Sequence, residues 1–437
     1  MNPVVDIESL DHEGHGVARL NGKVVFVDEA LPGEKAEIRI FRKHPKYDSA
    51  NAVSILKTSS QRAIPRCPHF GRCGGCSLQH LEPSAQVAVK QRVLEENLLR
   101  IGKVRPETLL PALHGPYWGY RNRARLSVRK VLKKGGVLVG FHEKRSSFIA
   151  DMHTCKVLHP AVASLIQPLR SLINEFSNSD RIPQVEIAVG DRITVLVFRL
   201  MEPWNSEDEK RVRDFVELHE GIQIWIQPKG PDTALPFYPL DAPDLDYSLP
   251  EFGLCIPFRP TEFTQVNMPI NRVLVSQAVH MLGPKPGERL GDFFCGLGNF
   301  TLPLARSGAS VVGIEGSKGL VERAKQNALA NSLSSVEFVV DDLFRMTPEK
   351  FAALGPFDRL LIDPPRDGAI ELVKSLGNQD GPRRIVYISC NPATLGRDAE
   401  VLCHVKGYRL ISAGVANMFP HTAHVESIAL FEREGMG

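Results

Sequence analysis

The sequence predicts three structural units, the last of which is an α/β domain built on a doubly wound parallel sheet. From about residue 260, the apolar runs VVGIE, VEFVV, RLLID and RIVYIS alternate with helical patterns, as in parallel sheets that are covered by helices. Residues 1–57 show five short strands separated by turn residues, and residues 117–255 are mostly strand-like. We therefore expect a barrel over 1–57, a central β-rich domain over 58–255 and the α/β domain over 256–437.

The first unit is expected to be a small closed barrel of the OB type. Its strands VVDIESL, GVARL, KVVFVDEA, AEIRIFRK and ANAVSILK are short, and Gly, Pro and acidic turns separate them. Gly14, Gly16, Val17 and the stretch FVDEALPGE at 26–34 resemble the TRAM domain, an RNA-associated barrel. Residues 1–50 carry seven basic and nine acidic side chains, so we expect this barrel to contribute little to phosphate binding.

A group of cysteines follows the barrel in the pattern C-x5-C-x2-C, formed by Cys67, Cys73 and Cys76. Three clustered cysteines need a fourth ligand, and Cys155 is the next one along the chain. Zinc sites more usually consist of two C-x2-C pairs, whereas three cysteines plus one with adjacent glycines suit an iron–sulfur cluster. We expect a [4Fe–4S] cluster with a structural role, with zinc as the alternative metal.

The segment after the cysteines is strongly basic. Residues 51–150 hold 18 basic and five acidic side chains, which is the charge expected of a surface that binds a polyphosphate partner. Within this segment, a helical pattern covers about 86–104, and the stretch PYWGYRNRARLSVRK at 116–130 interleaves aromatic residues with arginines. Such residues stack on bases and neutralise phosphates, but the same alternation also fits a strand with one solvated face.

The stretch GDFFCGLGNFTLPLA at 291–305 predicts a strand, a tight turn and the start of a helix. Gly296 and Gly298 would let the backbone approach a nucleotide-type cofactor closely. Glu315 ends the next strand, where its carboxylate can accept hydrogen bonds from ribose hydroxyls. Asp342 ends the strand after that and is a candidate for contact with adenine. These features fit NAD as well as a methyl donor.

The fourth strand ends in the turn Asp363-Pro364-Pro365, within FDRLLIDPPRDG. This series of strand ends resembles the class I S-adenosylmethionine-dependent methyltransferases, and the Asp-Pro-Pro turn favours that class over the NAD-dependent dehydrogenases. The alternative role for Asp363 is to cap the N-terminus of a helix.

Cys390 ends the fifth strand, in VYISCNPATLGRD, at the sheet edge where ligands bind in open α/β folds. A thiolate can add to C6 of uracil and thereby make C5 reactive toward a methyl group. Glu426, in FPHTAHVESIALF, is our candidate for the base that then removes the C5 proton. The alternative is that Cys390 is a small buried core residue.

The stretches SCNPATLGRD and PHTAHVES closely resemble the paired signatures of the RNA uracil-C5 methyltransferases. PFRPTEFTQVN at 257–267 resembles the stretch that opens the catalytic domain of that family. The resemblance implies that Cys390 is the nucleophile and Glu426 the base. It also implies S-adenosylmethionine as the methyl donor, bound by Gln265, Phe294, Asn299, Glu315, Asp342 and Asp363.

The barrel and the cysteines narrow this resemblance to the rRNA-modifying branch of the family. Members of that branch carry a [4Fe–4S] cluster on the pattern of Cys67, Cys73, Cys76 and Cys155. The implied reaction is methylation at C5 of a specific uridine in 23S rRNA, with the base flipped out of a loop or bulge. The alternatives are the same chemistry on another rRNA uridine or on tRNA, or an inactive iron–sulfur protein that binds RNA.

Composition excludes several other classes of protein. No apolar run approaches the roughly 18 residues needed to span a bilayer, and the N-terminal stretch has acidic residues where a signal peptide would be basic and then apolar. The eight cysteines are few and clustered, which favours a reducing compartment over a disulfide scaffold. We expect a cytoplasmic protein that does not associate with membranes and acts as a monomer.

Overall fold

The five N-terminal strands close into a barrel in the computed structural model, which describes residues 2–378 and 380–433. Alternate side chains of these strands, such as Val5, Ile7, Val25 and Val27, fill the interior of the barrel. The predicted OB-type barrel is therefore confirmed as a closed barrel with the strand order β1-β2-β3-β5-β4. Its strands are β1 (Val4–Leu10), β2 (Gly16–Leu20), β3 (Lys23–Asp28), β4 (Lys35–Lys43) and β5 (Tyr47–Lys57).

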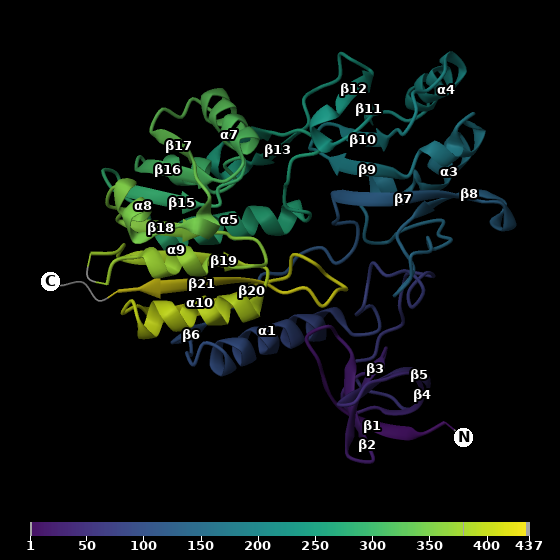
Figure 1. Ribbon diagram of the computed structural model, residues 1–437, viewed down its shortest axis with the longest axis horizontal. Helices are drawn as coiled ribbons and strands as arrows, with labels where there is room; N and C mark the ends of the chain where they lie inside the picture. The colour runs from purple at the N-terminus through teal and green to yellow at the C-terminus, as the bar shows by residue number, and fades with distance from the viewer. Residues whose placement is uncertain (1, 379, 434–437) are drawn as a thin grey trace.

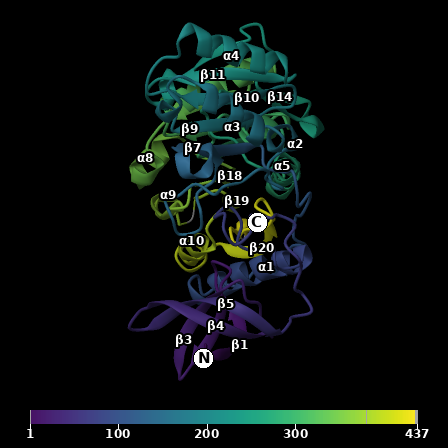
Figure 2. The ribbon, with the colours of Figure 1, turned by 90° about the vertical axis from the view of Figure 1, so that its right-hand side faces the viewer.

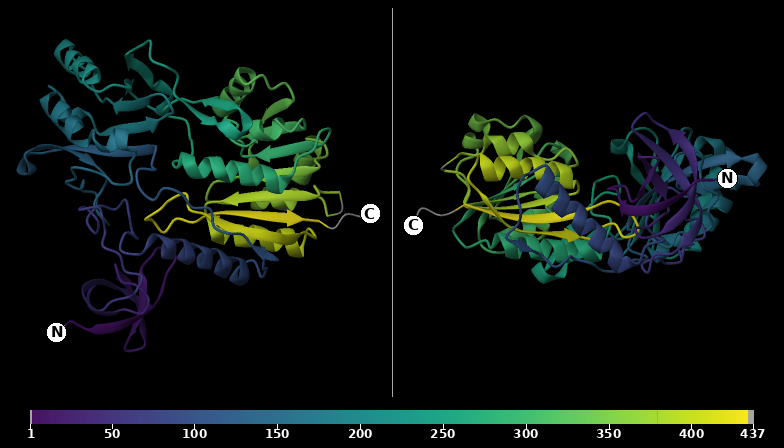
Figure 3. Two further views of the ribbon diagram at one scale, coloured as in Figure 1. Left: turned by 180° about the vertical axis from the view of Figure 1, so that it is seen from behind. Right: turned by 90° about the horizontal axis from the view of Figure 1, so that it is seen from below.

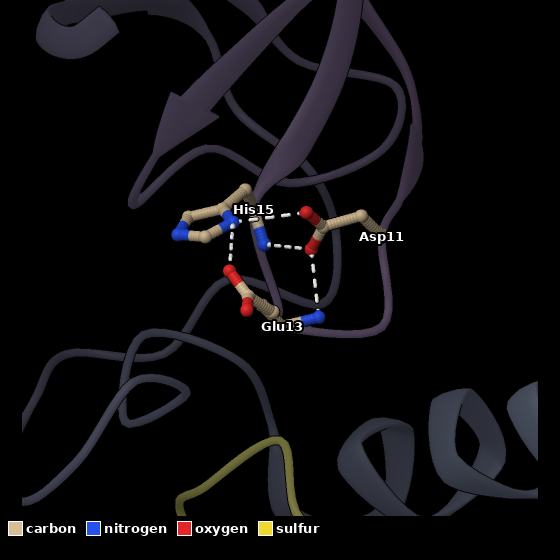
Figure 4. A group of neighbouring side chains, drawn as sticks. All are labelled: Asp11, Glu13 and His15. Carbon is tan, nitrogen blue, oxygen red and sulfur yellow. Dashed lines mark hydrogen bonds and ion pairs between the residues drawn. The ribbon is translucent and has the colours of Figure 1, made fainter. Parts of the chain in front are cut away.

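The turn between β1 and β2 is closed by a cluster of Asp11, Glu13 and His15 (Figure 4). The Asp11 carboxylate accepts hydrogen bonds from the backbone N–H of Glu13 at 2.9 Å and of His15 at 2.7 Å. It also lies 2.9 Å from Nδ1 of His15, and this hydrogen bond raises the pKa of the imidazole. The cluster thus satisfies the backbone of a tight turn.

A mixed six-stranded sheet forms the central part of the chain, in the order β12-β11-β10-β9-β7-β8. The helices α3 (Ile166–Glu175) and α4 (Ser206–Glu217) pack their apolar residues onto it, while a separate hairpin of two strands leads on to the last unit. The sheet strands are β7 (Arg123–Val131), β8 (Gly136–Gly140), β9 (Gln184–Val189), β10 (Thr194–Arg199), β11 (Ile222–Gln227) and β12 (Leu235–Tyr238), and the hairpin is β13 (Asp246–Leu249) with β14 (Leu254–Pro257).

An eight-stranded sheet forms the α/β domain, in the order β17-β16-β15-β18-β19-β21-β20-β6. The first five strands in this order are parallel, and β21 runs antiparallel to β19. The predicted doubly wound sheet is therefore confirmed, with an antiparallel hairpin added on one side. Its strands are β6 (Thr108–Leu109), β15 (Arg289–Phe293), β16 (Ser310–Glu315), β17 (Val336–Val340), β18 (Arg359–Ile362), β19 (Arg384–Ser389), β20 (Arg409–Ala416) and β21 (Glu426–Glu432).

Helices cover both faces of this sheet, and most of them follow a parallel strand in the chain (Figure 1). Two elements from the range 58–255 also belong to this domain. Helix α1 packs against α10 and β20, and β6 pairs with β20 as an edge strand of the sheet. The remaining helices are α1 (Pro83–Arg100), α2 (Pro160–Ala163), α5 (Met268–Leu282), α6 (Thr301–Ala305), α7 (Lys318–Ala330), α8 (Pro348–Ala353), α9 (Ile370–Ser375) and α10 (Pro392–His404).

Helix α1 begins three residues before its predicted start at 86 and ends before its predicted end at 104. Pro83 occupies the first turn, where its missing N–H is not needed. The helix ends at Arg100, and Lys103 then adopts a left-handed φ of 54° that no helix can continue through.

Helix α1 lies between the barrel and the hairpin of β20 and β21, and the six-stranded sheet lies on the far side of the molecule from the barrel (Figure 2). The loop that joins β20 to β21 extends out of the α/β domain toward the segments around residues 60–120 (Figures 1 and 3). Within the described residues, no helix combines the length and the apolarity that crossing a bilayer requires.

Candidate active site

A cavity of about 560 Å³ opens at the carboxyl ends of the parallel strands β15, β16, β18 and β19. Ligands bind at this edge in open α/β folds because the strands end there and the loops diverge. All eight residues that the sequence assigned to the donor and to the reaction line this one cavity. They are Gln265, Phe294, Asn299, Glu315, Asp342, Asp363, Cys390 and Glu426.

One end of the cavity is built to receive a nucleoside. Gly296 has a left-handed φ of 55°, and its backbone N–H donates to Oε2 of Glu315 at 3.2 Å. The other oxygen of Glu315 accepts from the N–H of Ser317 at 2.9 Å, so the carboxylate is fixed at the end of β16. The ring of Phe294 lies 5.6 Å from that of Phe344, and both rings line the same space. A fixed carboxylate beside aromatic rings suits a ribose and an attached base.

Asn299 is held by two residues that the sequence did not single out. It exchanges hydrogen bonds with the buried Asn271 of α5, at 2.9 and 3.0 Å between the two amides. The hydroxyl of Tyr247, from β13, donates to the Asn299 Oδ1 at 2.9 Å. These contacts fix which side of the Asn299 amide presents oxygen and which presents nitrogen.

At the other end of the cavity, Cys390, Asp363 and Glu426 come from three adjacent strand ends. Burial raises the pKa of the Cys390 thiol to about 11, and the carboxylates of Glu426 and Asp363 add to this effect. Burial also raises the pKa of Asp363 to about 7 and holds that of the fully buried Glu426 well above its usual range. Without a ligand, the cavity therefore favours the uncharged forms of Cys390 and Glu426 and shifts Asp363 toward its uncharged form.

Further groups line this end of the cavity beside Cys390. Arg366 follows the Asp-Pro-Pro turn, and its Nη2 lies 3.1 Å from Nδ1 of His424. Phe263 is 71% exposed although it is a large aromatic side chain at the mouth of the cavity. The capping role considered for Asp363 does not occur, because the next helix, α9, has Ala369 at its N-cap position.

The four cysteines of the predicted metal site line a second cavity, of about 90 Å³, between the segment of 67–76 and the loop that follows β8. Burial raises the pKa of Cys73 to about 11 and that of Cys76 to about 12, and it also raises the pKa of Cys155. Cys73, Cys76 and Cys155 are therefore costly to ionise, so a bound cation would be needed to hold them as thiolates.

The spacing of these sulfurs can be compared with that of a zinc site. Zinc with bonds of about 2.3 Å to sulfur places its ligands about 3.8 Å from one another. In the described part of the chain, Asp11, Glu13 and His15 are the one group of three or more His, Cys, Asp or Glu ligand atoms that all lie within 4.8 Å of one another. No three of the four cysteine sulfurs therefore all lie within 4.8 Å of one another, which is wider than the spacing of ligands around one zinc ion.

The arginines and aromatic residues predicted to face RNA are partly used for packing. Arg123 donates to the carbonyl of Pro260 at 2.7 Å, and Arg125 forms an ion pair with Glu186 at 3.0 Å. Tyr120 is buried, and its hydroxyl donates to the carbonyl of Pro420 at 2.9 Å. Part of the alternating pattern is thus used for packing, which is compatible with a strand that has one solvated face.

Comparisons with known proteins agree with this geometry. The crystal structure of Pyrococcus abyssi tRNA (uracil-54, C5)-methyltransferase in complex with S-adenosyl-L-homocysteine has a TM-score of 0.74 at 24% identity, covering 98% of this chain and 99% of that chain. The family model described as tRNA (Uracil-5-)-methyltransferase matches residues 254–434, and the TRAM domain model matches residues 4–53. The fold is that of a SAM-dependent methyltransferase with an N-terminal TRAM barrel.

Curated relatives identify the family. A 23S rRNA (uracil(1939)-C(5))-methyltransferase RlmD from Thiobacillus denitrificans is 73% identical, covering 99% of this chain and all of the relative. The RlmD protein of Dechloromonas aromatica is 57% identical over 98% of this chain and 99% of its own length. The chain belongs to the RlmD family of 23S rRNA (uracil-C5)-methyltransferases, which confirms the family expected from the signatures around Cys390 and Glu426.

Proposed function

We propose that the protein transfers the methyl group of S-adenosylmethionine to C5 of uridine 1939 in 23S rRNA, the position named for its relatives. The observation that carries this proposal is the single cavity that holds Cys390, Glu426 and the six donor residues together. A donor bound along Glu315 and Phe294 and a base bound against Cys390 would meet inside it. Proximity of this kind turns a reaction of two molecules into a step within one complex.

In the proposed reaction, Cys390 adds its sulfur to C6 of the uracil, and the electrons of the C5–C6 double bond move toward C5 and the O4 carbonyl. C5 then forms a bond to the methyl carbon, whose bond to the donor sulfur breaks. Glu426 takes the proton from C5, the double bond re-forms, and the bond from C6 to Cys390 breaks. The products are 5-methyluridine, S-adenosylhomocysteine, the regenerated Cys390 thiolate and a proton held by Glu426.

The protonation states of Cys390 and Glu426 favour an order in which the methyl donor binds before the thiol reacts. Cys390 and Glu426 must both be anions when they react, yet burial favours their neutral forms. A positively charged sulfonium in the same cavity would favour the anions, because an opposite charge nearby stabilises the ionised form. We infer that the thiol becomes nucleophilic only when the methyl donor is present.

We also propose that Cys67, Cys73, Cys76 and Cys155 hold a [4Fe–4S] cluster. The shared cavity, the wide spacing of the sulfurs and the donation from the Gly75 N–H to Sγ of Cys73 at 3.4 Å support this ligand set. Because the proposed methyl transfer moves no electrons to or from the protein, the cluster would serve as a structural element.

The proposed substrate is a loop or bulge of 23S rRNA from which the uridine flips into the cavity, since C6 of a stacked base could not reach Cys390. We propose the domain organisation expected from the sequence: a TRAM barrel (1–57), a central domain (58–255) that carries the cluster and the basic segment facing RNA, and a catalytic domain (256–437). The enzyme would act as a monomer in the cytoplasm.

The test is methylation of a 23S rRNA transcript with labelled S-adenosylmethionine, followed by mapping of the product by mass spectrometry. We expect one 5-methyluridine, at position 1939, and none in a transcript with cytidine at that position. A methyl group at another rRNA uridine, or one accepted only by a tRNA transcript, would contradict the proposed substrate. A protein that binds the transcript but never methylates RNA would contradict the proposed activity.

A further inference from the structure

The loop of residues 417–425, which joins β20 to β21, forms one wall of the active-site cavity. Phe419 and His424 of this loop line the cavity, and Glu426 follows it as the first residue of β21. The loop extends away from the sheet and toward the N-terminal half of the chain (Figure 3). Its conformation therefore depends on what holds it from outside the sheet.

Lys90, in the middle of α1, is fully buried and points at this loop. Its Nζ donates to Oδ1 of Asn417 and to the carbonyl of Phe419, both at 2.8 Å. In the part of the chain that the structure describes, no carboxylate lies within ion-pairing distance of Lys90, and burial lowers its pKa to about 7. An apolar side chain would avoid this desolvation cost, so the two loop oxygens account for a lysine at this position.

Gln86, one helical turn before Lys90, is also fully buried and holds the same loop. Its Oε1 accepts from the backbone N–H of His421 at 2.8 Å, and its Nε2 lies 3.2 Å from Nδ1 of that imidazole. The same Nε2 donates to the carbonyls of Leu78 and Leu81, at 3.0 and 2.8 Å. One amide thus joins α1, the segment that follows the cysteines and the active-site loop.

The segment that follows Cys76 holds the loop directly as well. The backbone N–H groups of Ser77 and Leu78 both donate to the carbonyl of His421 at 2.9 Å. The indole of Trp118 stacks on the imidazole of His421 with 3.8 Å between the ring centres. His421 has a left-handed φ of 66°, which is uncommon for a residue other than glycine and persists only where neighbours enforce it.

We propose that Gln86 and Lys90 are positioning residues for methyl transfer, which hold the 417–425 loop so that Glu426 reaches the C5 proton. This inference rests on the proposed function. Neither side chain lines the cavity, so both act through the loop. Cys390 directly follows β19 and is carried by that strand, whereas Glu426 is the first residue after the loop. Loss of the contacts should therefore slow proton removal more than the addition of the thiol.

The experiment compares Lys90→Met and Gln86→Leu with Leu99→Met, which changes an exposed, uncharged side chain on the same helix. For the first two variants, we expect turnover on the 23S rRNA transcript to fall about 100-fold, the scale of a small misplacement of a reacting group. A covalent RNA–protein adduct that carries the methyl group should accumulate in denaturing gels. The Kd for S-adenosylmethionine should stay within about twofold of the wild-type value, and Leu99→Met should behave as the wild type does.

Two outcomes would overturn the inference: wild-type turnover in both variants, or a parallel loss of turnover, adduct and donor binding in every variant that folds. Thermal unfolding of the full-length protein identifies the variants that fold, and the two positions serve as alternatives if one does not. Failure of the wild-type protein to form 5-methyluridine would contradict the proposed function itself, which separates the two results.

Discussion

Glu426 is buried close to the Cys390 thiol. In the proposed reaction, its carboxylate takes the C5 proton, and this step allows the bond between C6 and the Cys390 sulfur to break. Glu426→Gln keeps the shape of the side chain but cannot accept the C5 proton. We expect release of 5-methyluridine to fall by about 100- to 10,000-fold, as for the loss of a general base, while a methylated RNA–protein adduct accumulates. Denaturing gels with labelled RNA measure the adduct.

The control for this variant is Glu400→Gln, on the exposed side of α10, which should leave turnover unchanged. Free product at the wild-type rate from Glu426→Gln would remove Glu426 from the reaction.

The raised pKa of Cys390 makes its alkylation depend on pH in a defined direction. Because burial raises the thiol pKa to about 11, the reactive thiolate is a small fraction at neutral pH and grows about tenfold per pH unit. Iodoacetamide labelling of the Cys390 peptide, followed by mass spectrometry, should therefore keep rising up to pH 10. Saturating S-adenosylmethionine should increase the rate at pH 7.5, and S-adenosylhomocysteine, which lacks the sulfonium charge, should not.

A plateau of the labelling rate near pH 8.5, the ordinary range of a cysteine, would show that the cavity does not perturb this thiol.

The residue pattern alone predicts the part of the site formed by residues that end parallel strands. Glu315, Asp363 and Cys390 each follow an apolar run, and parallel strands bring their carboxyl ends to one edge. Tyr247 and Asn271 could not be found in the same way, because only the packing of the β13–β14 hairpin and α5 brings them to Asn299.

The segment that follows the cysteines is hydrogen-bonded to the active-site loop, because the backbone N–H groups of Ser77 and Leu78 donate to the carbonyl of His421. Protein purified without oxygen should contain about four iron atoms per chain, as expected for four-thiolate ligation. Cys155→Ser should lose this iron, and hydrogen exchange should then increase in residues 417–425 as well as around the cysteines. Exposed Cys255 supplies the control, because Cys255→Ser should change neither the iron content nor the exchange.

Stoichiometric zinc without iron would contradict the proposed cluster. Loss of iron without faster exchange in the loop would show that the two regions are independent.

Helices and strands could be predicted from the sequence wherever the local spacing of apolar residues matches the pattern of burial. All five strands of the barrel and the parallel strands of the last sheet were predicted from short apolar runs between turns. The addition of α1 and β6 to the α/β domain could not be predicted, because the partners α10 and β20 lie about 300 residues further along the chain. Whether Arg123 packs or faces RNA could not be decided from the sequence, since alternation shows which residues share a face but not what covers it.

At the scale of the whole molecule, charge is distributed unevenly, with 18 basic against five acidic residues in 51–150. Lys133 and Lys134 are exposed just after the end of β7. Lys43 and Lys46 are an equally exposed pair of lysines in the barrel, and they serve as the matched control. We expect changing Lys133 and Lys134 to Gln to lower the salt dependence of rRNA binding by about 0.7 per lost phosphate contact, in a plot of log Kd against log salt. The same changes at Lys43 and Lys46 should leave it nearly unchanged.

A larger loss of salt dependence from the barrel pair than from the central pair would place the main phosphate-binding surface on the TRAM barrel.

The most direct measurement follows the hydrogen at C5 itself. A 23S rRNA transcript with tritium at C5 of its uridines is incubated with S-adenosylmethionine that carries a labelled methyl group. Methylation through a Cys390 adduct requires one tritium released to water for each methyl group incorporated, and Cys390→Ala should show neither event. Incorporation of methyl groups without tritium release, or normal release and incorporation by Cys390→Ala, would contradict methylation of C5 through Cys390.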